Sequence, residues 1–504
     1  MSKILTLKKL DKILENYRKK RKKIVLCHGV FDLLHLGHIN HFKEAKTKGD
    51  ILVVTITKDR FVNKGPGRPL FKENSRAKML EALAYIDFVA INDWATSINT
   101  IKLLKPNIYF KGPDYKKNSN DITGNITKEK KAVELNGGKI LYSTYETFSS
   151  SSLINKFTNI QNINQKQIIN KINSKYSFNK ILKIFEDIRK LNVLIIGESI
   201  IDEYVFCEAL GKSGKESILT FKDEKKEKYL GGVLAIANHC LSFSKSIEII
   251  SYLGKDDGAK YIKNKTDKNI KVNFINKGNS PTLIKRRYLD QVNSNKIFGI
   301  YTLNDDSLNK QENSLLKKII KAKIKKTDLV VVADYGHGLI DNELAEFICK
   351  NNKNISINAQ INSANVGFHN IRKFNNFKNL IINANELRHT MRERKGNLEN
   401  LAKKLKSEIK AENILVTSGK NGAMLLDKKN NIIKCPAFAN EVVDKVGAGD
   451  AFLMIFSLIL KTSKDLNLSM FAGSLAAAQS VKTMGNKNKI DKTILLKAIQ
   501  YILK

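Results

Sequence analysis

The stretch KIVLCHGVFDLLHLGHINHF, residues 23–42, joins an apolar run to a helix-like run through a turn rich in histidine. His28, His35 and His38 lie in this turn and His41 follows, although the 504-residue chain has only 8 histidines. The apolar run predicts a buried strand and the run after the turn predicts a helix. The histidines are therefore expected at the carboxyl end of a strand, where open α/β sheets bind their ligands.

A helix N-terminus at this turn suits a phosphate group. Its first backbone N–H groups are free, and the positive end of the helix dipole faces the ligand. Gly37 lets the backbone approach closely, and His35 and His38 can donate ring N–H groups to phosphoryl oxygens as negative charge develops. Two alternatives are helix-start packing and a metal site, although no second cluster of Cys, Asp or Glu with ligand spacing accompanies the motif.

Two series of strand-like and helix-like runs predict two α/β units with parallel sheets. Residues 158–175, between the two series, are polar and rich in Asn, Gln and Lys, which predicts a linker or a bridging helix. Residues 178–191 read as a helix, and so does the amphipathic N-terminus from Ile4 to Tyr17, which we expect to pack on the first unit. The strand-like runs are residues 23–29, 50–57, 85–91, 106–112 and 138–144, then 192–202, 247–254, 328–336, 354–360, 379–386 and 413–419.

The composition favours a cytoplasmic protein that binds neither nucleic acid nor membrane. The 88 Lys and Arg outnumber the 49 Asp and Glu to give a net charge of +39, but the bases are spread along the chain and form no single stripe. The 5 cysteines are widely separated and favour reduced thiols. The longest apolar run, residues 451–460, covers about half a membrane span. A basic nucleic-acid-binding or regulatory protein stays open as an alternative.

A second informative stretch is DKVGAGDAFLMIFSLIL, residues 444–460. Gly447, Ala448 and Gly449 form a small-residue turn that opens an apolar helix, and their N–H groups can face a transferring phosphoryl group. Asp450, in the first turn, can take a proton from a substrate hydroxyl. Taken alone, the pattern also fits a plain helix start with an aspartate that favours the dipole.

GVFDLLHLGH resembles the signature of cytidylyltransferase-like nucleotidyltransferases, and residues 1–157 are similar to the adenylyltransferase domain of the bifunctional heptose kinase/adenylyltransferases. The matching segments continue in order at residues 44–59, 63–83, 108–115 and 148–157. The resemblance implies a Rossmann-like domain in which a sugar phosphate attacks a nucleoside triphosphate and pyrophosphate leaves. The family usually has Gly-Gly-Asp where this chain has GPD, and Ser-Thr-Thr where it has SSSS, so the base is less certain than the reaction.

The same resemblance implies the residues of the first site. His35 and His38 would contact the nucleotide phosphates, and Lys46 would neutralise the triphosphate or the acceptor phosphate. Ser150 and Ser151 would bind phosphate at the last helix start. The remaining nucleotide- or phosphate-binding residues would be Gly29, Phe31, Asp32, Lys64, Arg76, Lys111 and Asp114.

GAGDAF, residues 447–452, resembles the signature of ribokinase-like sugar kinases of the PfkB family, and further motifs of that family follow the expected order. The resemblance implies a ribokinase-like domain with a small β lid, formed between Tyr204 and Leu230 and extended by residues 281–290. Asp450 would be the catalytic base and residues 447–449 the anion hole. The sugar-binding residues would be Asp202, Gly231, Gly232 and Asn238, with Lys285 and Arg287 facing a phosphate; Asn383 and Glu386 would organise Mg²⁺ through water, and Gly419 and Gly422 would lie at the nucleotide turn.

The motif ADYGHG, residues 333–338, supplies Asp334 after a strand. His337 of the same motif reads equally well as a polar core residue or as a substrate contact.

Together the motifs predict a nucleotidyltransferase domain at 1–157, a linker at 158–177 and a sugar kinase domain at 178–504, in the reverse of the order usual for the heptose enzymes. The expected chemistry is phosphorylation of heptose 7-phosphate at C1 with ATP, then nucleotidyl transfer from ATP or CTP, with magnesium present. A separate phosphatase must act in between. The alternative is an alditol-phosphate cytidylyltransferase fused to another sugar kinase or to a kinase-like scaffold. The expected partners are sugar phosphates and nucleoside triphosphates, and a homodimer is possible.

Overall fold

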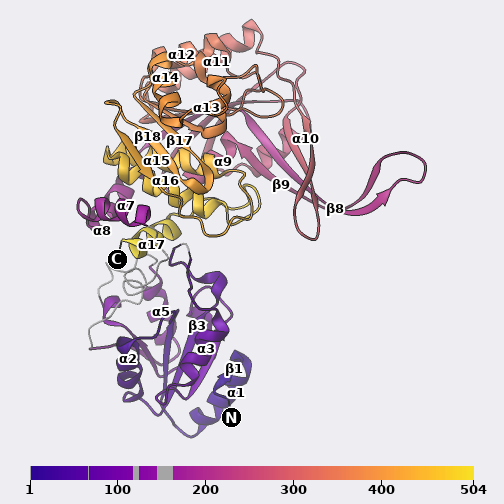
Figure 1. Ribbon diagram of the computed structural model, residues 1–504. Helices are drawn as coiled ribbons and strands as arrows, with labels where there is room; N and C mark the ends of the chain where they lie inside the picture. The colour runs from indigo at the N-terminus through magenta and orange to yellow at the C-terminus, as the bar shows by residue number, and fades with distance from the viewer. Residues whose placement is uncertain (1, 66, 117–123, 145–162, 504) are drawn as a thin grey trace. The chain divides into compact units, whose positions relative to one another are not determined.

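The computed structural model describes residues 2–65, 67–116, 124–144 and 163–503 (Figure 1). Its contacts divide the chain into two compact units, residues 1–162 with 496–504, and residues 163–495. Each unit is built on a sheet of its own, which confirms the expected α/β class.

The first unit contains a six-stranded, fully parallel sheet in the order β1-β4-β3-β2-β5-β6. From β2 the chain first builds strands on one side and then on the other, so the strand order reverses at β2. Ligands bind at such a reversal, outside the carboxyl ends of the strands. The strands are β1 (Ile4–Leu5), β2 (Ile24–Gly29), β3 (Ile51–Thr57), β4 (Phe88–Asn92), β5 (Ile108–Lys111) and β6 (Lys139–Tyr142).

Alternating side chains of β2 bury two different cores, because successive residues of a strand point to opposite faces. Val25 and Cys27 pack with α2 and α3, whereas Ile24 and Leu26 pack with α1, α4 and α5. The N-terminal helix begins later than expected, since Ile4 pairs with β4 and Thr6 caps the helix. The helices are α1 (Leu7–Lys19), α2 (Leu36–Lys46), α3 (Glu73–Glu81), α4 (Ile98–Leu104) and α5 (Asn125–Glu134), with short turns η1 (Asp59–Phe61) and η2 (Pro113–Tyr115).

The second unit contains a nine-stranded sheet in the order β11-β10-β7-β14-β15-β16-β17-β18-β19. Its pairs are parallel up to β17, and the last two pairs are antiparallel. The strand order reverses between β7 and β14. The strands are β7 (Asn192–Gly197), β10 (Ser246–Leu253), β11 (Ile270–Asn276), β14 (Leu329–Asp334), β15 (Ile355–Ala359), β16 (Asn379–Asn383), β17 (Asn413–Thr417), β18 (Ala423–Leu426) and β19 (Ile432–Cys435).

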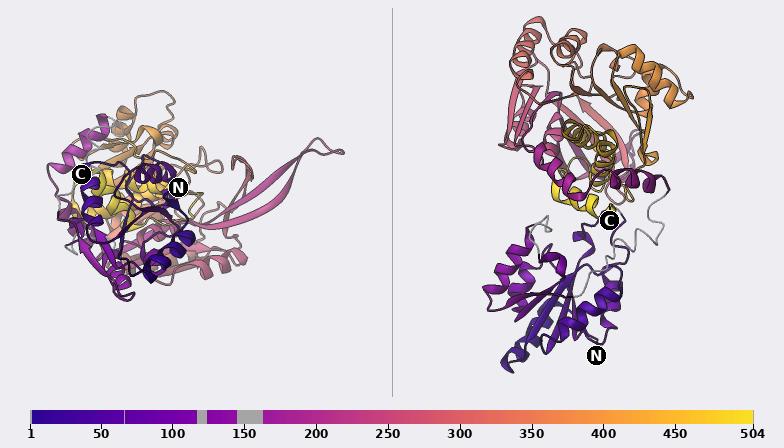
Figure 2. Two further views of the ribbon diagram at one scale, coloured as in Figure 1. Left: turned by 90° about the horizontal axis from the view of Figure 1, so that it is seen from below. Right: turned by 90° about the vertical axis from the view of Figure 1, so that its left-hand side faces the viewer.

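A smaller mixed sheet, ordered β13-β12-β8-β9, forms the expected lid. Its strands are β8 (Ser199–Lys212), β9 (Leu219–Gly232), β12 (Leu283–Asp290) and β13 (Lys296–Thr302). The β8–β9 hairpin projects well beyond the rest of this unit (Figures 1 and 2). The lid therefore includes both segments named from the sequence.

Helices cover the second sheet, and α15 is buried along most of its length. The apolar run 451–460 lies in α15 and is a core helix of this unit. Among the described helices, none is both long and apolar enough to cross a membrane. The helices are α7 (Ile163–Asn173), α8 (Phe178–Ile188), α9 (Val233–Cys240), α10 (Asp257–Lys265), α11 (Lys310–Ile324), α12 (Asn342–Asn351), α13 (Ala384–Met391), α14 (Leu398–Ile409), α15 (Ala448–Ser463) and α16 (Leu466–Ser480). The last helix, α17 (Lys492–Ile502), begins in the second unit, and its residues from Leu496 onward are assigned to the first.

Part of the segment expected as a linker is helix α7, which packs on the second unit. The helix buries Ile168, Ile169 and Ile172, and the side-chain amide of Gln165 donates to the Ala437 carbonyl at 2.7 Å. Residues 158–162 lie outside the described residues.

Candidate active sites

The histidine turn of the first unit lies at the carboxyl end of β2, as the sequence predicted. His35 is the N-cap of α2, and its ring stacks on that of His38 with 4.0 Å between centroids. Phe31 adopts a left-handed backbone conformation with φ of 48°, which brings its ring edge-on to His38 at 5.4 Å. A side chain at Gly29 would place its Cβ 2.9 Å from the end of the Phe31 ring, so a larger residue there would require that ring to shift.

Both histidines at the helix start are neutral near pH 7. Burial lowers the pKa of His38 to about 3, and the neighbouring His35, Lys64 and His41 further disfavour a positive charge on its ring. Burial and Lys64 also lower the pKa of His35. Each ring can therefore donate one N–H to a phosphate while carrying no net charge, and Lys64 supplies positive charge nearby.

Asp32 anchors this turn to the loop that follows η1. Its buried carboxylate accepts hydrogen bonds from Arg68 Nε at 2.8 Å and from the backbone N–H groups of Leu70 and Phe71 at 2.7 and 3.0 Å. Asp32 therefore anchors this turn, and the nucleotide contact expected of it stays a prediction.

The expectation that Arg76 binds a phosphate is corrected by its surroundings. The Arg76 side chain is 0% exposed. Its guanidinium donates to the carbonyls of Val30, Thr57 and Phe71 at 2.6 to 2.9 Å and to Asp59 Oδ1 at 2.6 Å. A buried guanidinium with these partners holds the loops around the site together and cannot reach a ligand.

Lys46, which the sequence suggested would neutralise a substrate phosphate, lies away from the histidine turn. It is the last residue of α2, about 15 Å of helix away from the histidines. Its ammonium donates to the Asp50 carbonyl at 2.7 Å and pairs with the carboxylate of Asp87. Asp50 and Asp87 directly precede β3 and β4, so Lys46 lies at the amino edge of the sheet, opposite the ligand edge.

The remaining residues predicted for the first site divide into two groups. Lys111, at the end of β5, is buried and pairs with Glu129 at 3.1 Å, while Ser97 donates to the other oxygen of Glu129 at 2.6 Å. This carboxylate already compensates the Lys111 charge. The backbone of Asp114 lies in η2 and its side chain is outside the described part of the structure, as are Ser150 and Ser151 entirely.

In the second unit Asp450 is a buried carboxylate in the first turn of α15. Its Oδ1 accepts a hydrogen bond from the Tyr335 hydroxyl at 3.0 Å and one from Gln360 Nε2 at 3.3 Å. Burial raises the pKa of Asp450 to about 7; the Asp202 charge adds to this, whereas the Tyr335 hydrogen bond and the Lys285 charge oppose it. A carboxylate with a pKa near the working pH is well suited to act as a general base.

Asp202, on the lid strand β8, is held from two sides. Arg287 Nη1 donates to Asp202 Oδ1 at 2.6 Å, and Asn486 Nδ2 donates to Oδ2 at 3.1 Å. A Cβ at Gly231 would lie 2.2 Å from Oδ2, so only glycine fits beside this carboxylate. The charge of Arg287 is compensated by Asp202, which makes Arg287 a weaker candidate for binding a phosphate than the sequence suggested.

Lys285 is the cation that remains available in this site. Its side chain is buried on β12 and forms no hydrogen bond or ion pair with any residue in the described ranges. Its ammonium lies 5.6 Å from the Tyr301 ring centroid and 5.9 Å from that of Tyr335. Burial lowers the pKa of Lys285, and Asp202 is the strongest of the neighbouring charges that oppose this change.

The glycine motifs around this site have distinct local reasons. Gly447 has φ of 83° and is the N-cap of α15. The Ala448 N–H donates to the Lys445 carbonyl at 3.3 Å, whereas the N–H groups of Gly449 and Asp450 have no acceptor within the helix. Gly449 is exposed, and a Cβ there would meet nothing within 4 Å. Gly232 caps α9 with φ of 61°, and Asn238 lies partly exposed on the same helix.

The nucleotide turn predicted at Gly419 and Gly422 lies between β17 and β18. Both glycines have left-handed φ angles, 55° and 85°. A Cβ at Gly422 would come within 2.2 Å of the Cys435 carbonyl, whereas Gly419 faces open space. Gly422 is thus required by packing, and Gly419 is the more accessible of the two.

Asn383 and Glu386 form a capping box at the start of α13. Asn383 Oδ1 accepts from the Glu386 N–H at 2.9 Å, and a Glu386 oxygen accepts from the Asn383 N–H at 2.8 Å. Burial raises the pKa of Glu386 to about 7, and the Asp450 charge adds to the effect. The buried carboxyl groups of Glu386 and Asp450 provide a setting that Mg²⁺ fits, since Mg²⁺ prefers oxygen ligands and keeps bound waters. Among the described residues, no three His, Cys, Asp or Glu are grouped to hold a metal directly.

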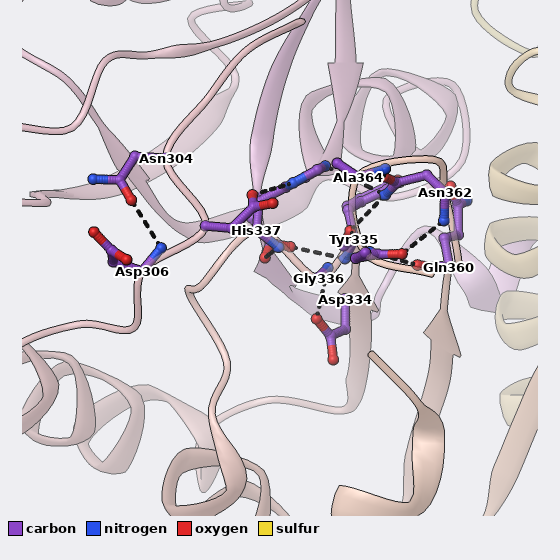
Figure 3. A network of polar contacts seen from close by, with 12 residues as sticks. Asn304, Asp306, Asp334, Tyr335, Gly336, His337, Gln360, Asn362 and Ala364 are labelled. Carbon is purple, nitrogen blue, oxygen red and sulfur yellow. Dashed lines mark hydrogen bonds and ion pairs between the residues drawn. The ribbon is translucent and has the colours of Figure 1, made fainter. Parts of the chain in front are cut away.

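Sequence reasoning missed Glu198, which follows β7 where the strand order reverses. Glu198 is 0% exposed and accepts hydrogen bonds from the backbone N–H groups of Tyr335 and His337 at 2.9 and 3.0 Å. The sequence feature that could have identified Glu198 is its position as an acidic residue directly after an apolar strand. His337 is buried and its Nδ1 lies 2.8 Å from Asp305 Oδ1, which identifies it as a core residue of this turn (Figure 3).

Comparisons with known proteins agree with the two-unit architecture. The family described as pfkB family carbohydrate kinase matches residues 190–493, and the Cytidylyltransferase-like family matches residues 26–157. The sequence is 36% identical over 155 residues to Bifunctional protein HldE of Helicobacter pylori, covering 30% of this chain and 31% of that protein. It is 41% identical over 138 residues to the protein of the same name from Campylobacter fetus, covering 27% and 28%.

The chain thus spans about a third of the length of the curated relatives it matches. Among solved structures, a ribokinase from Thermotoga maritima superposes with a TM-score of 0.50 at 20% identity, covering 62% of this chain and 99% of that one. A phosphofructokinase-2 variant from Escherichia coli also reaches a TM-score of 0.50, at 14% identity, with 62% and 100% covered. At these identities the likeness shows the fold alone.

Proposed function

The chain belongs to the pfkB family of carbohydrate kinases, and from this premise we propose that it is a bifunctional enzyme of nucleotide-sugar synthesis. The second unit phosphorylates a sugar with ATP. The first unit, of the cytidylyltransferase-like family, transfers a nucleotidyl group to a sugar 1-phosphate and releases pyrophosphate.

The observation that carries the kinase reaction is the buried carboxylate of Asp450 beside the open N-terminus of α15. Asp450 takes the proton of the acceptor hydroxyl while that oxygen forms a bond to the γ-phosphorus of ATP. The bond from the γ-phosphorus to the bridging oxygen of ADP breaks, and ADP leaves. The backbone N–H groups of residues 447–449 and the Lys285 ammonium stabilise the charge on the transferring group.

Magnesium, held through water by Glu386 and Asn383, would neutralise charge on the ATP phosphates. Asp202 orients the sugar hydroxyls, with Gly231, Gly232 and Asn238 shaping the same side of the site. Gly419 lies on the nucleotide side.

The nucleotidyl transfer requires no base from the protein, because a sugar 1-phosphate oxygen already carries negative charge. That oxygen bonds to the α-phosphorus of ATP or CTP, and the bond to the pyrophosphate oxygen breaks. His35 and His38 donate neutral N–H groups to the phosphates, and Lys64 supplies positive charge. This requires alignment and charge stabilisation, both of which a helix N-terminus provides.

The sugar we propose is heptose 7-phosphate, phosphorylated at C1 and converted to an ADP-heptose-like product for surface polysaccharide such as lipopolysaccharide. Two features support it. One is the resemblance of residues 1–157 to heptose adenylyltransferases. The other is the buried Lys285, which has no ion-pair partner among the residues that the structure describes and suits an acceptor that brings a phosphate of its own. A separate phosphatase must remove the 7-phosphate between the two steps.

A second candidate is a cytidylyltransferase for an alditol or glycerol phosphate, with the kinase unit acting on another sugar or serving as a scaffold. The GPD sequence at residues 112–114, which departs from the Gly-Gly-Asp of the family, favours this alternative.

Mass spectrometry of the purified protein with magnesium, ATP or CTP, and a panel of heptose 7-phosphates, other sugars and alditol phosphates distinguishes the two. A heptose bisphosphate that disappears in Asp450→Ala is the expected result. Pyrophosphate release from CTP with an alditol phosphate, and no phosphorylation of any heptose, would overturn the heptose proposal and support the second candidate.

A further inference from the structure

We propose that Tyr335 and Gln360 are positioning residues for Asp450, which bind its Oδ1 and leave Oδ2 as the oxygen that receives the substrate proton. The inference rests on the kinase family of the second unit and is independent of which sugar that unit phosphorylates.

The geometry shows two donors that converge on one oxygen. The Tyr335 hydroxyl and the Gln360 amide reach Asp450 Oδ1 at 3.0 and 3.3 Å, from the ends of β14 and β15. No described residue donates a side-chain hydrogen bond to Oδ2. A carboxylate bound through one oxygen cannot rotate freely about χ2, so its other oxygen keeps a fixed direction.

The Tyr335 backbone is held by a buried polar network, shown in Figure 3. The Tyr335 N–H donates to Glu198 Oε2 at 2.9 Å, and the Tyr335 carbonyl accepts from Asn362 and Asn365 at 3.1 and 2.9 Å. Gln360 is fixed to the neighbouring strand, because its N–H donates to the Asp334 carbonyl at 2.8 Å. The network satisfies every polar backbone group of Tyr335, so the hydroxyl position is set by rigid elements.

Tyr335 can only act as a donor here. Burial raises its pKa well above the ordinary value, and the negative charge of Asp450 raises it further. The hydroxyl therefore stays protonated at working pH and stabilises the ionised carboxylate, the form that can take a proton. The other charged groups that act on Asp450 are Asp202, which opposes its ionisation, and Lys285, which favours it. The Asp450 charge in turn opposes the ionisation of Glu386.

Tyr335→Phe removes the hydroxyl and keeps the ring. We expect kcat for sugar phosphorylation to fall about tenfold at pH 7, the range for losing one hydrogen bond to a charged group. The acid limb of the kcat profile should move to higher pH, KM should stay nearly constant, and activity should recover as pH rises. Gln360→Met should produce a smaller shift in the same direction, because its bond is longer.

Tyr252→Phe is the matched control. Tyr252 is buried in the same unit, and its hydroxyl donates to the His337 carbonyl at 3.3 Å without touching Asp450. It should keep the wild-type pH profile. An equal shift in Tyr252→Phe, or an unmoved acid limb in both Tyr335→Phe and Gln360→Met, would overturn the proposal in favour of a purely structural role.

A second readout needs no sugar. The difference in unfolding free energy between wild type and Asp450→Asn, followed against pH, reports the titration of Asp450. Its midpoint should move to higher pH in the Tyr335→Phe background and stay in place in the Tyr252→Phe background. If no sugar in the panel is phosphorylated, the proposed function fails while this titration still decides the role of Tyr335; an unmoved midpoint overturns it.

Discussion

The two candidate sites both use the N-terminus of a helix, α2 in the first unit and α15 in the second, but they differ in the charge that stands beside it. In the first unit the neighbours are neutral histidines and Lys64. In the second, Asp450 lies in the helix, the Asp202 charge opposes its ionisation, and the Asp450 charge in turn raises the pKa of Glu386.

The difference follows from the group that attacks phosphorus. A sugar phosphate is already an anion, so donors and cations suffice to bind and align it. A sugar hydroxyl must lose a proton, so the kinase site needs a carboxylate whose pKa lies near the working pH. Carboxylates near the first site would repel both substrates, and the acids found there, Asp32 and Asp59, are paired with arginines.

The sharpest way to break this comparison is to remove the base. Asp450→Asn should lower kcat for sugar phosphorylation by about 10³-fold, within the 10²–10⁴ range of general-base catalysis. Nucleotidyl transfer by the same protein should be unchanged, since that reaction needs no base. Retained phosphorylation in the Asn variant, measured as ADP release, would contradict the role of Asp450.

Removing a histidine donor tests the first site. His38→Ala should slow pyrophosphate release by about 10²-fold, the usual effect of losing one donor that stabilises developing charge. Phosphorylation by the second unit should not change. His41→Ala, one turn along α2 with its ring 5.0 Å from that of Phe110, is the matched control and should keep most of the activity. Equal losses in both variants would mean that the helix start acts through packing.

The pH dependence of the two activities sharpens the contrast. Phosphorylation should fall about tenfold per pH unit below about pH 7, as Asp450, whose pKa is raised to about 7, becomes protonated. Titration of His38 should not change the rate of nucleotidyl transfer between pH 6 and 8, because the pKa of His38 is lowered to about 3 and its ring is neutral throughout this range. Parallel profiles for the two activities would refute this distinction.

Stability offers a smaller and independent test. The pKa of Asp450 is raised from 3.8 to about 7 in the folded protein, so its ionisation opposes folding as pH rises between these values. At pH 8 the Asp450→Asn variant should therefore have a free energy of unfolding higher than wild type by at most about 4 kcal/mol, measured by denaturant titration. This difference in stability should shrink towards pH 4. A gain that does not depend on pH would have another origin.

The smallest expected effect belongs to Lys46. Lys46→Met should leave pyrophosphate release within about twofold of wild type and lower stability by about 1 kcal/mol or less, as for a partly exposed ion pair. Kinetics at saturating nucleotide, with Lys64→Met as the comparison, would check this. A large loss of activity for Lys46→Met alone would restore the sequence-based assignment.

Much of the fold was predictable because its signals are local. The apolar strands, the helix after the histidine turn and the glycine turn before Asp450 are short-range patterns, and most lie where they were expected. The run 192–202 is divided between β7 and the start of β8, and the run 379–386 ends in the first turn of α13. The helix of residues 163–173 was left open as linker or helix, since its burial depends on contacts with Ala437 and the second unit, far away in the chain.

The sequence predicted where the residues of the candidate sites lie, but it predicted less well what each side chain does there. The sequence by itself determined that His35 and His38 start a helix after a strand and that Asp450 starts an apolar one, because periodicity and helix-start chemistry act within a few residues. Only the tertiary structure decided that Arg76 and Asp32 hold loops, that Lys46 lies at the opposite edge of the sheet, and that Tyr335 reaches Asp450. A charged side chain acts on whichever group folding brings within about 3 Å of it, and that neighbour is seldom close in sequence.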